Sequence, residues 1–337
     1  LPKAIRSLLS QTLNDFEVLI IDDGSTDNTE NVISSFRDGR IRYYKKNHTG
    51  PSATYNFGLK HAWGNYIGYL DDDDILYPNH LKTLSAFLDT HSGIGLVYAD
   101  IDIKSRHRLR SLYPWDFSKK LLEVDNVIPG NCSLLHRKAC IAKTGLYNES
   151  LHFAEDWDFW LRLSDSYKIA HIKETVAQVR PQKTSITYNK QRHIPAYTSI
   201  ILRRLRSQSA LLPFPGYYLQ VAFRLIYKFR SPKERCIPFI KRLILMNNAH
   251  PEARISLCLC YLAYHERRMA RQTATQAVRL LQNRKDNQLS CLYYALIQSM
   301  LSEQRAATEA SRYTKRPLTK EPSLRSAERE IAAIFSL

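Results

Sequence analysis

Acidic side chains gather in three short segments of the first half of the chain, at residues 22–23, 71–74 and 155–156. Carboxylates that lie this close repel one another and raise each other's pKa. Two kinds of chemistry suit them. They can cap helices, because acidic side chains are favoured at helix N-termini. They can also hold a divalent cation together with the phosphate oxygens that it carries.

The segments around these acids predict an α/β fold. We predict strands at 16–22, 41–46, 65–70 and 93–100, separated by helices at 2–10, 26–36, 50–62 and 79–91. Strands and helices that alternate at this pace indicate a mostly parallel, doubly wound, Rossmann-like sheet. Ligands bind such sheets beyond the carboxyl ends of the strands. Because residues 22–23 and 71–74 both end predicted strands, their position favours binding over capping alone.

The positive charge of the chain is concentrated in its second half. The 337 residues carry a formal net charge of +17. Residues 1–189 hold 23 Lys and Arg against 23 Asp and Glu, whereas residues 190–337 hold 26 against 9. We therefore predict a catalytic domain at 1–190 and a basic, all-helical region at 191–337. Basic surfaces attract anionic lipid, acidic polymers or nucleic acid, but no nucleic-acid-binding motif is recognised, so we expect no nucleic acid partner.

Two patterns in the basic region each allow two interpretations. Residues 217–230 are amphipathic and basic, which suits either contact with a membrane surface or a core-facing helix. Residues 258–279 resemble residues 291–312 at a shift of 33, near the period of tetratricopeptide-like hairpins, although a plain helical bundle fits equally well. The identical pairs are Cys258/Cys291, Leu259/Leu292, Tyr261/Tyr294, Ala274/Ala307, Thr275/Thr308, Ala277/Ala310 and Arg279/Arg312.

Composition bears on the compartment in which the protein works. The six cysteines show no CxxC pair and no zinc-site spacing, so we expect reduced thiols that fill the core of a cytoplasmic protein. No run of about 18 or more uncharged apolar residues occurs, and no helix that spans a bilayer is expected. No signal peptide is recognised.

The order of the motifs resembles that of family 2 glycosyltransferases. "SLLSQTLNDFEVLIIDDGSTDNT", "GNYIGYLDDDDILYPNHL" and "HFAEDWDFWLRL" follow one another as in that family, with "GLVYAD" and "GNCSLLHRKACIAKTGLYNESL" between the last two. The resemblance covers residues 1–190 and implies the A-type nucleotide-diphospho-sugar transferase fold. It also implies transfer of a sugar, with inversion, from a nucleotide-diphosphate sugar to a hydroxyl of a saccharide or lipid-linked acceptor. The expected donor is a UDP-sugar, and the expected process is synthesis of a cell-surface polysaccharide.

The resemblance assigns roles to the acids near the strand ends. The family's D-x-D pattern falls on Asp71 and Asp73: Asp73 would ligate Mg²⁺ or Mn²⁺, and Asp71 would share the metal or touch the donor ribose. A cation suits a diphosphate leaving group because it supplies counter-charge without a proton transfer. Asp22 and Asp23 would bind the nucleotide, although Asp-Gly-Ser is also good turn chemistry. Asp74 would cap the helix that follows.

The third motif would supply the base. By resemblance, Asp156 takes the proton from the acceptor hydroxyl, a step that needs a carboxylate placed opposite the leaving group. Glu155 and Trp157 would lie on the acceptor side, although Trp157 could equally fill the core. Asp158 and Arg162 stand four residues apart, which predicts an ion pair along a helix.

The chain also departs from the family pattern. It begins inside the helix that follows the family's first strand, so we expect that strand to be missing. Tyr55 precedes Asn56 where the family often has Arg, which removes a phosphate contact. Two alternatives stay open: a catalytically decayed scaffold whose basic helices bind protein or a membrane surface, and a glycosidase, which also uses two carboxylates. A D-x-D at a strand end suits a metal better than a glycosidase pair.

Overall fold

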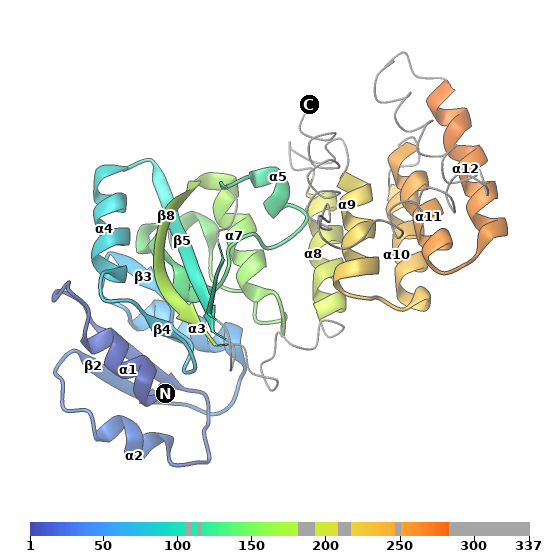
Figure 1. Ribbon diagram of the computed structural model, residues 1–337. Helices are drawn as coiled ribbons and strands as arrows, with labels where there is room; N and C mark the ends of the chain where they lie inside the picture. Colours follow the sequence, from blue (N-terminus) through green and yellow to red (C-terminus); the bar gives the residue numbers. More distant parts are fainter. Residues whose placement is uncertain (105–108, 113–115, 181–192, 208–216, 247–250, 283–337) are drawn as a thin grey trace. The chain divides into compact units, whose positions relative to one another are not determined.

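A computed structural model describes residues 1–104, 109–112, 116–180, 193–207, 217–246 and 251–282. The chain divides into two compact units, Leu1–Ile200 and Ile201–Leu337. Strands occur in the first unit, and the described part of the second unit contains helices (Figure 1).

The first unit contains all eight elements predicted for the first hundred residues, with a short strand added. These are α1 (Pro2–Leu9), β1 (Val18–Asp22), α2 (Thr29–Ser34), β2 (Ile41–Lys45), α3 (Pro51–His61), β3 (Tyr66–Gly68), β4 (Ile75–Leu76), α4 (His80–Thr90) and β5 (Ile94–Lys104). The unit continues with β6 (Leu109–Leu112), α5 (Lys119–Leu122), β7 (Leu134–Arg137), α6 (Ile141–Thr144), α7 (Glu155–Ser166), β8 (Lys168–Val179) and α8 (Ile194–Arg206), which extends into the second unit.

The strands confirm an α/β fold, but their pairing is less parallel than the alternation predicts. Among the described residues, β1 and β2 form a parallel pair of their own. The larger sheet has the order β3-β7-β5-β8-β4, with β6 also paired to β5, and in it β5 and β8 are the parallel pair. Alternation gives the order of elements along the chain and does not say which strands become neighbours. Here β7 inserts antiparallel to both β3 and β5 and so separates two strands that we expected to lie in parallel.

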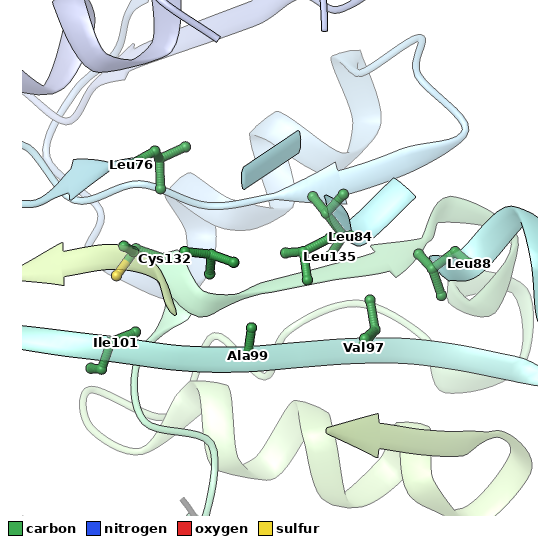
Figure 2. Packing of buried hydrophobic residues seen from close by; sticks show 10 residues of the cluster. Leu76, Leu84, Leu88, Val97, Ala99, Ile101, Cys132 and Leu135 are labelled. Atoms are coloured by element: carbon green, nitrogen blue, oxygen red, sulfur yellow. The ribbon is translucent and has the colours of Figure 1, made fainter. Parts of the chain in front are cut away.

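Helices cover both faces of the larger sheet. Leu84 and Leu88 of α4 belong to one buried cluster with Val97 of β5 and Leu135 of β7, and Figure 2 shows Val97 directed toward the strand that carries Leu135. Successive residues of a strand point to opposite faces. His136 accordingly meets the other face, where its ring lies 5.9 Å from that of Trp160 in α7.

Asp74 does not cap α4, contrary to the prediction. Asn79 holds the N-cap position of that helix. Asp74 is buried just before β4, and its Oδ1 accepts a hydrogen bond from the backbone N–H of Arg180 at 3.0 Å. The carboxylate therefore ties the acidic segment to the end of β8.

The second unit is built from packed helices. They are α9 (Tyr217–Phe223), a π-helical turn (Arg224–Lys228), α10 (Lys233–Met246), α11 (Pro251–Ala263) and α12 (Arg267–Gln282). Tyr217, Val221 and Leu225 are buried, so the stretch at 217–230 follows the core-facing interpretation. In the repeat comparison, residues 258–279 fall within the described helices, while residues 291–312 lie outside the described part of the chain.

The state of the cysteines and the length of the helices bear on the expectations drawn from composition. Cys132, Cys140, Cys236, Cys258 and Cys260 are buried and unbridged, as predicted. Among the described helices, none combines the length and apolar character that crossing a bilayer would require.

The α4 face of the sheet should dominate the stability of the first unit. Leu84 is fully buried, so Leu84→Ala should lower the free energy of unfolding by about 2–5 kcal/mol, through lost burial and a cavity. Leu109→Ala, at a side chain that is 57% exposed, should change it by about 0.5 kcal/mol or less. All four tryptophans precede residue 161, so urea unfolding followed by tryptophan fluorescence reports this unit. Equal effects of the two substitutions would contradict the packing described.

Candidate active site

Helix α7 carries the third acidic motif at its first turn. Ala154, which precedes the helix, has φ 57° in the left-handed region, so the chain turns sharply into Glu155 and Asp156. A non-glycine residue with positive φ costs free energy and is held there by its surroundings. Acidic side chains in a first turn also interact favourably with the helix dipole. The N-terminus of α7 is therefore a position in which two carboxylates can be held together.

The predicted ion pair on α7 is present. Arg162 Nε donates to Asp158 Oδ2 at 3.0 Å, and Asp158 is buried. The same guanidinium donates to the carbonyl oxygens of Thr144 and Leu146. These bonds fasten α7 to the segment that precedes it.

The second and third acidic motifs lie near each other. Surrounding protein atoms raise the pKa of Asp71 to about 7, and the charges of Asp74, Asp73, Asp72 and Asp156 add to the effect. Asp71 nonetheless keeps contact with solvent. Burial raises the pKa of Glu155 to about 7 as well, and repulsion from Asp156 and Asp71 contributes. Residues more than eighty positions apart in the sequence thus form one acidic site.

Tyr55, at the position of the expected Arg, faces this acidic site. Burial raises the pKa of its hydroxyl well above the usual value, and the charges of Asp71 and Glu155 act in the same direction. The phenol therefore stays protonated. Its oxygen accepts a hydrogen bond from Asn131 Nδ2 at 3.3 Å. A neutral hydrogen-bonding group stands where the family pattern would place a cation.

Hydrogen bonds from Trp157 and Asn126 orient Asp156. Its Oδ1 accepts from the backbone N–H of Trp157 at 2.7 Å, and its Oδ2 accepts from Asn126 Nδ2 at 2.8 Å. Asn126 and Asn131 belong to the loop between α5 and β7, which has no regular periodicity. Sequence reasoning therefore missed Asn126, and no local signal would have found it.

Trp157 lies in the core. Its side chain is 2% exposed, its indole N–H donates to the carbonyl oxygen of Leu122 at 2.7 Å, and its ring stacks on Tyr197 at 5.2 Å. Of the two roles that the sequence allowed, this placement favours packing over contact with an acceptor sugar.

Asp22 and Asp23 end β1 and hold the loops around it. Asp22 accepts hydrogen bonds from the backbone N–H of Ser25 and the hydroxyl of Tyr43. Burial opposes their effect, yet these bonds lower its pKa. Asp23 accepts from Lys46 Nζ and from the N–H groups of residues 49 and 50, and despite its partial burial its pKa falls to about 2. Both carboxylates are thus ionised and anchored at neutral pH.

The residues of the D-x-D pattern can take a cation only with help from other ligands. Within the described ranges, no three His, Cys, Asp or Glu side chains are grouped as a complete metal site. Mg²⁺ is commonly held by one or two carboxylates, with water and substrate phosphates completing its shell. Four carboxylates give the largest charge–charge contributions at Asp71, so the carboxylates gathered there fit a cation arriving with a diphosphate.

Similarity to known proteins agrees with this geometry. A family model described as "Glycosyl transferase family 2" matches residues 1–148. An uncharacterized glycosyltransferase of Rickettsia typhi is 30% identical over 224 residues, which are 62% of this chain and 70% of the relative. The chain belongs to glycosyltransferase family 2.

Other relatives match over a smaller part of their own length. An uncharacterized glycosyltransferase of Rickettsia felis is 31% identical over 182 residues, or 53% of this chain and 30% of the relative. The GalNAc(5)-diNAcBac-PP-undecaprenol beta-1,3-glucosyltransferase of Campylobacter jejuni is 34% identical over 132 residues, or 38% of this chain and 41% of that enzyme. The chain therefore spans less than half the length of these two relatives.

Solved structures show the same nucleotide-diphospho-sugar transferase fold. TarS of S. aureus in complex with UDP-GlcNAc has a TM-score of 0.52 and 17% identity, and the match covers 80% of this chain and 84% of TarS. A mannosyltransferase from Pyrobaculum calidifontis in complex with GDP-Man and Mn²⁺ has a TM-score of 0.52 and 14% identity, with 86% and 81% covered. At these identities the likeness concerns the fold.

The raised pKa of Asp71 predicts that this family 2 site destabilises the folded chain. The carboxyl has a pKa of about 7 in the fold against an ordinary 3.8, so the unfolded chain releases the proton at lower pH. The contribution of Asp71 to stability should therefore become more unfavourable as pH rises from about 4 to about 7 and level off above. Asp71→Asn should stabilise the chain at pH 8 by about 1 kcal/mol. The gain is no larger because solvent screens the charge of an exposed carboxylate. At pH 4 the gain should be much smaller.

Urea unfolding at pH 4 and pH 8 checks this, with Asp15→Asn as control because Asp15 is exposed and lies outside the acidic motifs. A gain for Asp71→Asn that does not depend on pH would mean that the acidic residues do not repel one another as described.

Proposed function

We propose that this chain is an inverting glycosyltransferase that moves a sugar from a UDP-sugar to a hydroxyl of a saccharide or lipid-linked acceptor. The observation that carries the proposal is the convergence of Asp71 with Glu155 and Asp156, from two distant segments, despite their mutual repulsion. A fold retains such a site when a ligand balances its charge. The complex of TarS with UDP-GlcNAc supports UDP as the nucleotide, and the undecaprenol-linked acceptor in the name of the Campylobacter relative supports a lipid-linked acceptor.

Asp71 and Asp73 would hold a divalent cation, Mg²⁺ or Mn²⁺, together with the diphosphate of the donor. When bound, that cation supplies the counter-charge that a departing diphosphate needs. The Mn²⁺ in the mannosyltransferase complex supports this choice of ion. Asp74 would contribute by fixing the acidic segment that carries Asp71 and Asp73 to the backbone of Arg180.

The nucleotide end of the donor would lie against the loops after β1 and β2. Asp22 and Asp23 hold these loops. Each carboxylate oxygen can accept more than one hydrogen bond, so the contacts of Asp22 with Ser25 and Tyr43 leave room for a uracil imide or a ribose hydroxyl, and Asp23 would act by holding the loop.

Asp156 would be the base. Its carboxylate takes the proton of the acceptor hydroxyl as the oxygen of that hydroxyl attacks the anomeric carbon, and the bond to the diphosphate breaks on the opposite side. Such general-base catalysis contributes about 10²–10⁴-fold to the rate. Glu155, beside it with a pKa near 7, would line the acceptor side.

Two variants separate binding from chemistry. Asp73→Ala should abolish the part of UDP binding that depends on Mn²⁺, because the cation loses a ligand, as measured by calorimetric titration with and without chelator. Asp156→Asn should bind UDP as the wild type does, yet release UDP from UDP-sugars about 10²–10⁴-fold more slowly. UDP binding that ignores both Mn²⁺ and Asp73→Ala would refute the cation site. Absence of UDP binding to the folded wild type would favour the decayed scaffold.

We also propose that the second unit contacts the cytoplasmic face of an anionic membrane through α10. One face of this helix is buried by residues such as Cys236 and Ile240, while Lys241 and Arg242 are exposed beside Leu245, which is 80% exposed. Basic residues next to exposed apolar ones are the composition that binds anionic lipid surfaces. Each basic residue near such a surface contributes about 1 kcal/mol.

Lys241→Glu with Arg242→Glu should therefore lower binding to vesicles that contain phosphatidylglycerol by about tenfold or more, measured by sedimentation with the vesicles. Lys60→Glu with Lys82→Glu, a charge-matched pair in the first unit where both side chains are exposed, should have a much smaller effect. Equal binding to neutral phosphatidylcholine vesicles would argue against a charge-driven contact.

A further inference from the structure

The loop between α5 and β7 is attached rigidly to the helix that carries the base. Trp157 Nε1 donates to the carbonyl oxygen of Leu122 at 2.7 Å, and Tyr197 Oη donates to the carbonyl oxygen of Val124 at 2.9 Å. The rings of Trp157 and Tyr197 are both 2% exposed and stack with planes 14° apart. The end of α5 and the start of the loop after it are thereby held against α7 and α8.

This attachment brings Asn126 to Asp156 with its amide in a defined orientation. Asn126 Oδ1 accepts a hydrogen bond from the backbone N–H of Ile128 at 3.2 Å, and its Nδ2 donates to Asp156 Oδ2 at 2.8 Å. An N–H needs an acceptor opposite it and a carboxylate needs a donor, so the two partners leave one amide orientation. The other oxygen of Asp156 is held by the N–H of Trp157, which fixes the plane of the carboxylate.

We propose that Asn126 is the positioning residue of Asp156, holding the carboxylate in the orientation that accepts the proton of the attacking hydroxyl. The proposal rests on the proposed role of Asp156 as the base. It also explains why Asp156, and not the adjacent Glu155, would act as the base. An uncharged donor orients Asp156 without neutralising it, whereas a Lys or Arg in the same place would compete for the negative charge that the cation and the acceptor proton require.

Asn126→Asp is isosteric and keeps the oxygen that faces Ile128, while it replaces the donor to Asp156 with a carboxylate that repels it. Asn126→Ala removes both. In the full chain with Mn²⁺, we measure UDP release from UDP-GlcNAc and UDP-glucose with water as the acceptor. Both variants should lower kcat about 10–100-fold, the range for loss of a hydrogen bond to a charged group. The KM for the donor and the Kd for UDP should stay within about twofold of the wild type, which a merely structural role would not predict.

Asn148→Asp is the matched control, because Asn148 likewise accepts from a backbone N–H two residues on, that of Ser150, at an exposed turn. It should leave kcat unchanged. If Asp156→Asn keeps its kcat, the proposed function fails. If Asp156→Asn loses kcat while both Asn126 variants keep it, or if they change KM and Kd in place of kcat, the positioning role alone is overturned.

A second measurement needs no turnover. A double-mutant cycle of Asn126→Ala and Asp156→Ala compares the urea unfolding midpoints of the two single variants and the double variant. The contact described predicts that the two effects are not additive. Additive effects would overturn the proposal even in a chain that shows no UDP release.

Discussion

Electrostatic repulsion between carboxylates is the constraint on which the site depends. Asp71 and Glu155 both have a pKa of about 7, because burial disfavours their charge and repulsion from neighbouring acids adds to the effect. Left to themselves, the two acidic segments would separate. The fold opposes this with contacts on the far side of each segment: Asp74 is bonded to Arg180, and α7 is fixed by Arg162 and by its buried aromatic face. The acids converge because the elements behind them cannot move apart.

A second set of contacts connects α3 to the segment before α7, the helix that carries the proposed base. Asn56 of α3 donates to the carbonyl oxygen of Tyr147 and accepts from its N–H, and Ser52 donates to the carbonyl oxygen of Leu151. The segment held in this way leads directly into α7. Helix α3 also carries Tyr55, which faces Asp71 and Glu155. A shift of α3 would therefore displace Asp156, the proposed base, together with Tyr55, which keeps the spacing of the two residues constant.

The sequence predicted those features that have a local cause. Strands and helices follow from periodicity, so α1, β1, α3 and α4 were found, and the acidic motifs were placed because they end strands or begin helices. The Asp158–Arg162 pair followed from helical spacing. For features that join distant segments, the predictions were missing or wrong. The place of β7 between β3 and β5, the bond of Asp74 to Arg180 and the reach of Asn126 to Asp156 have no signature in any single window. The aromatic character of Trp157 suited a sugar platform or a core equally, and only packing could decide.

The two acidic motifs that end β1 and follow β3 differ in how their charge is balanced, and this difference bears on their roles. Lys46 and two backbone N–H groups lower the pKa of Asp23 to about 2, so the protein itself satisfies that carboxylate, and its charge serves to shape a loop. At Asp71 the neighbours are carboxylates and the pKa rises to about 7. Evolution for stability alone would favour a neutral residue there, since an unbalanced charge costs free energy in the folded state. The cost is understandable if the balancing charge arrives with the substrate, as a cation bound to a diphosphate does. The same reasoning favours Asn over Lys or Arg at position 126, because a resident cation beside Asp156 would weaken the base and compete with the incoming metal.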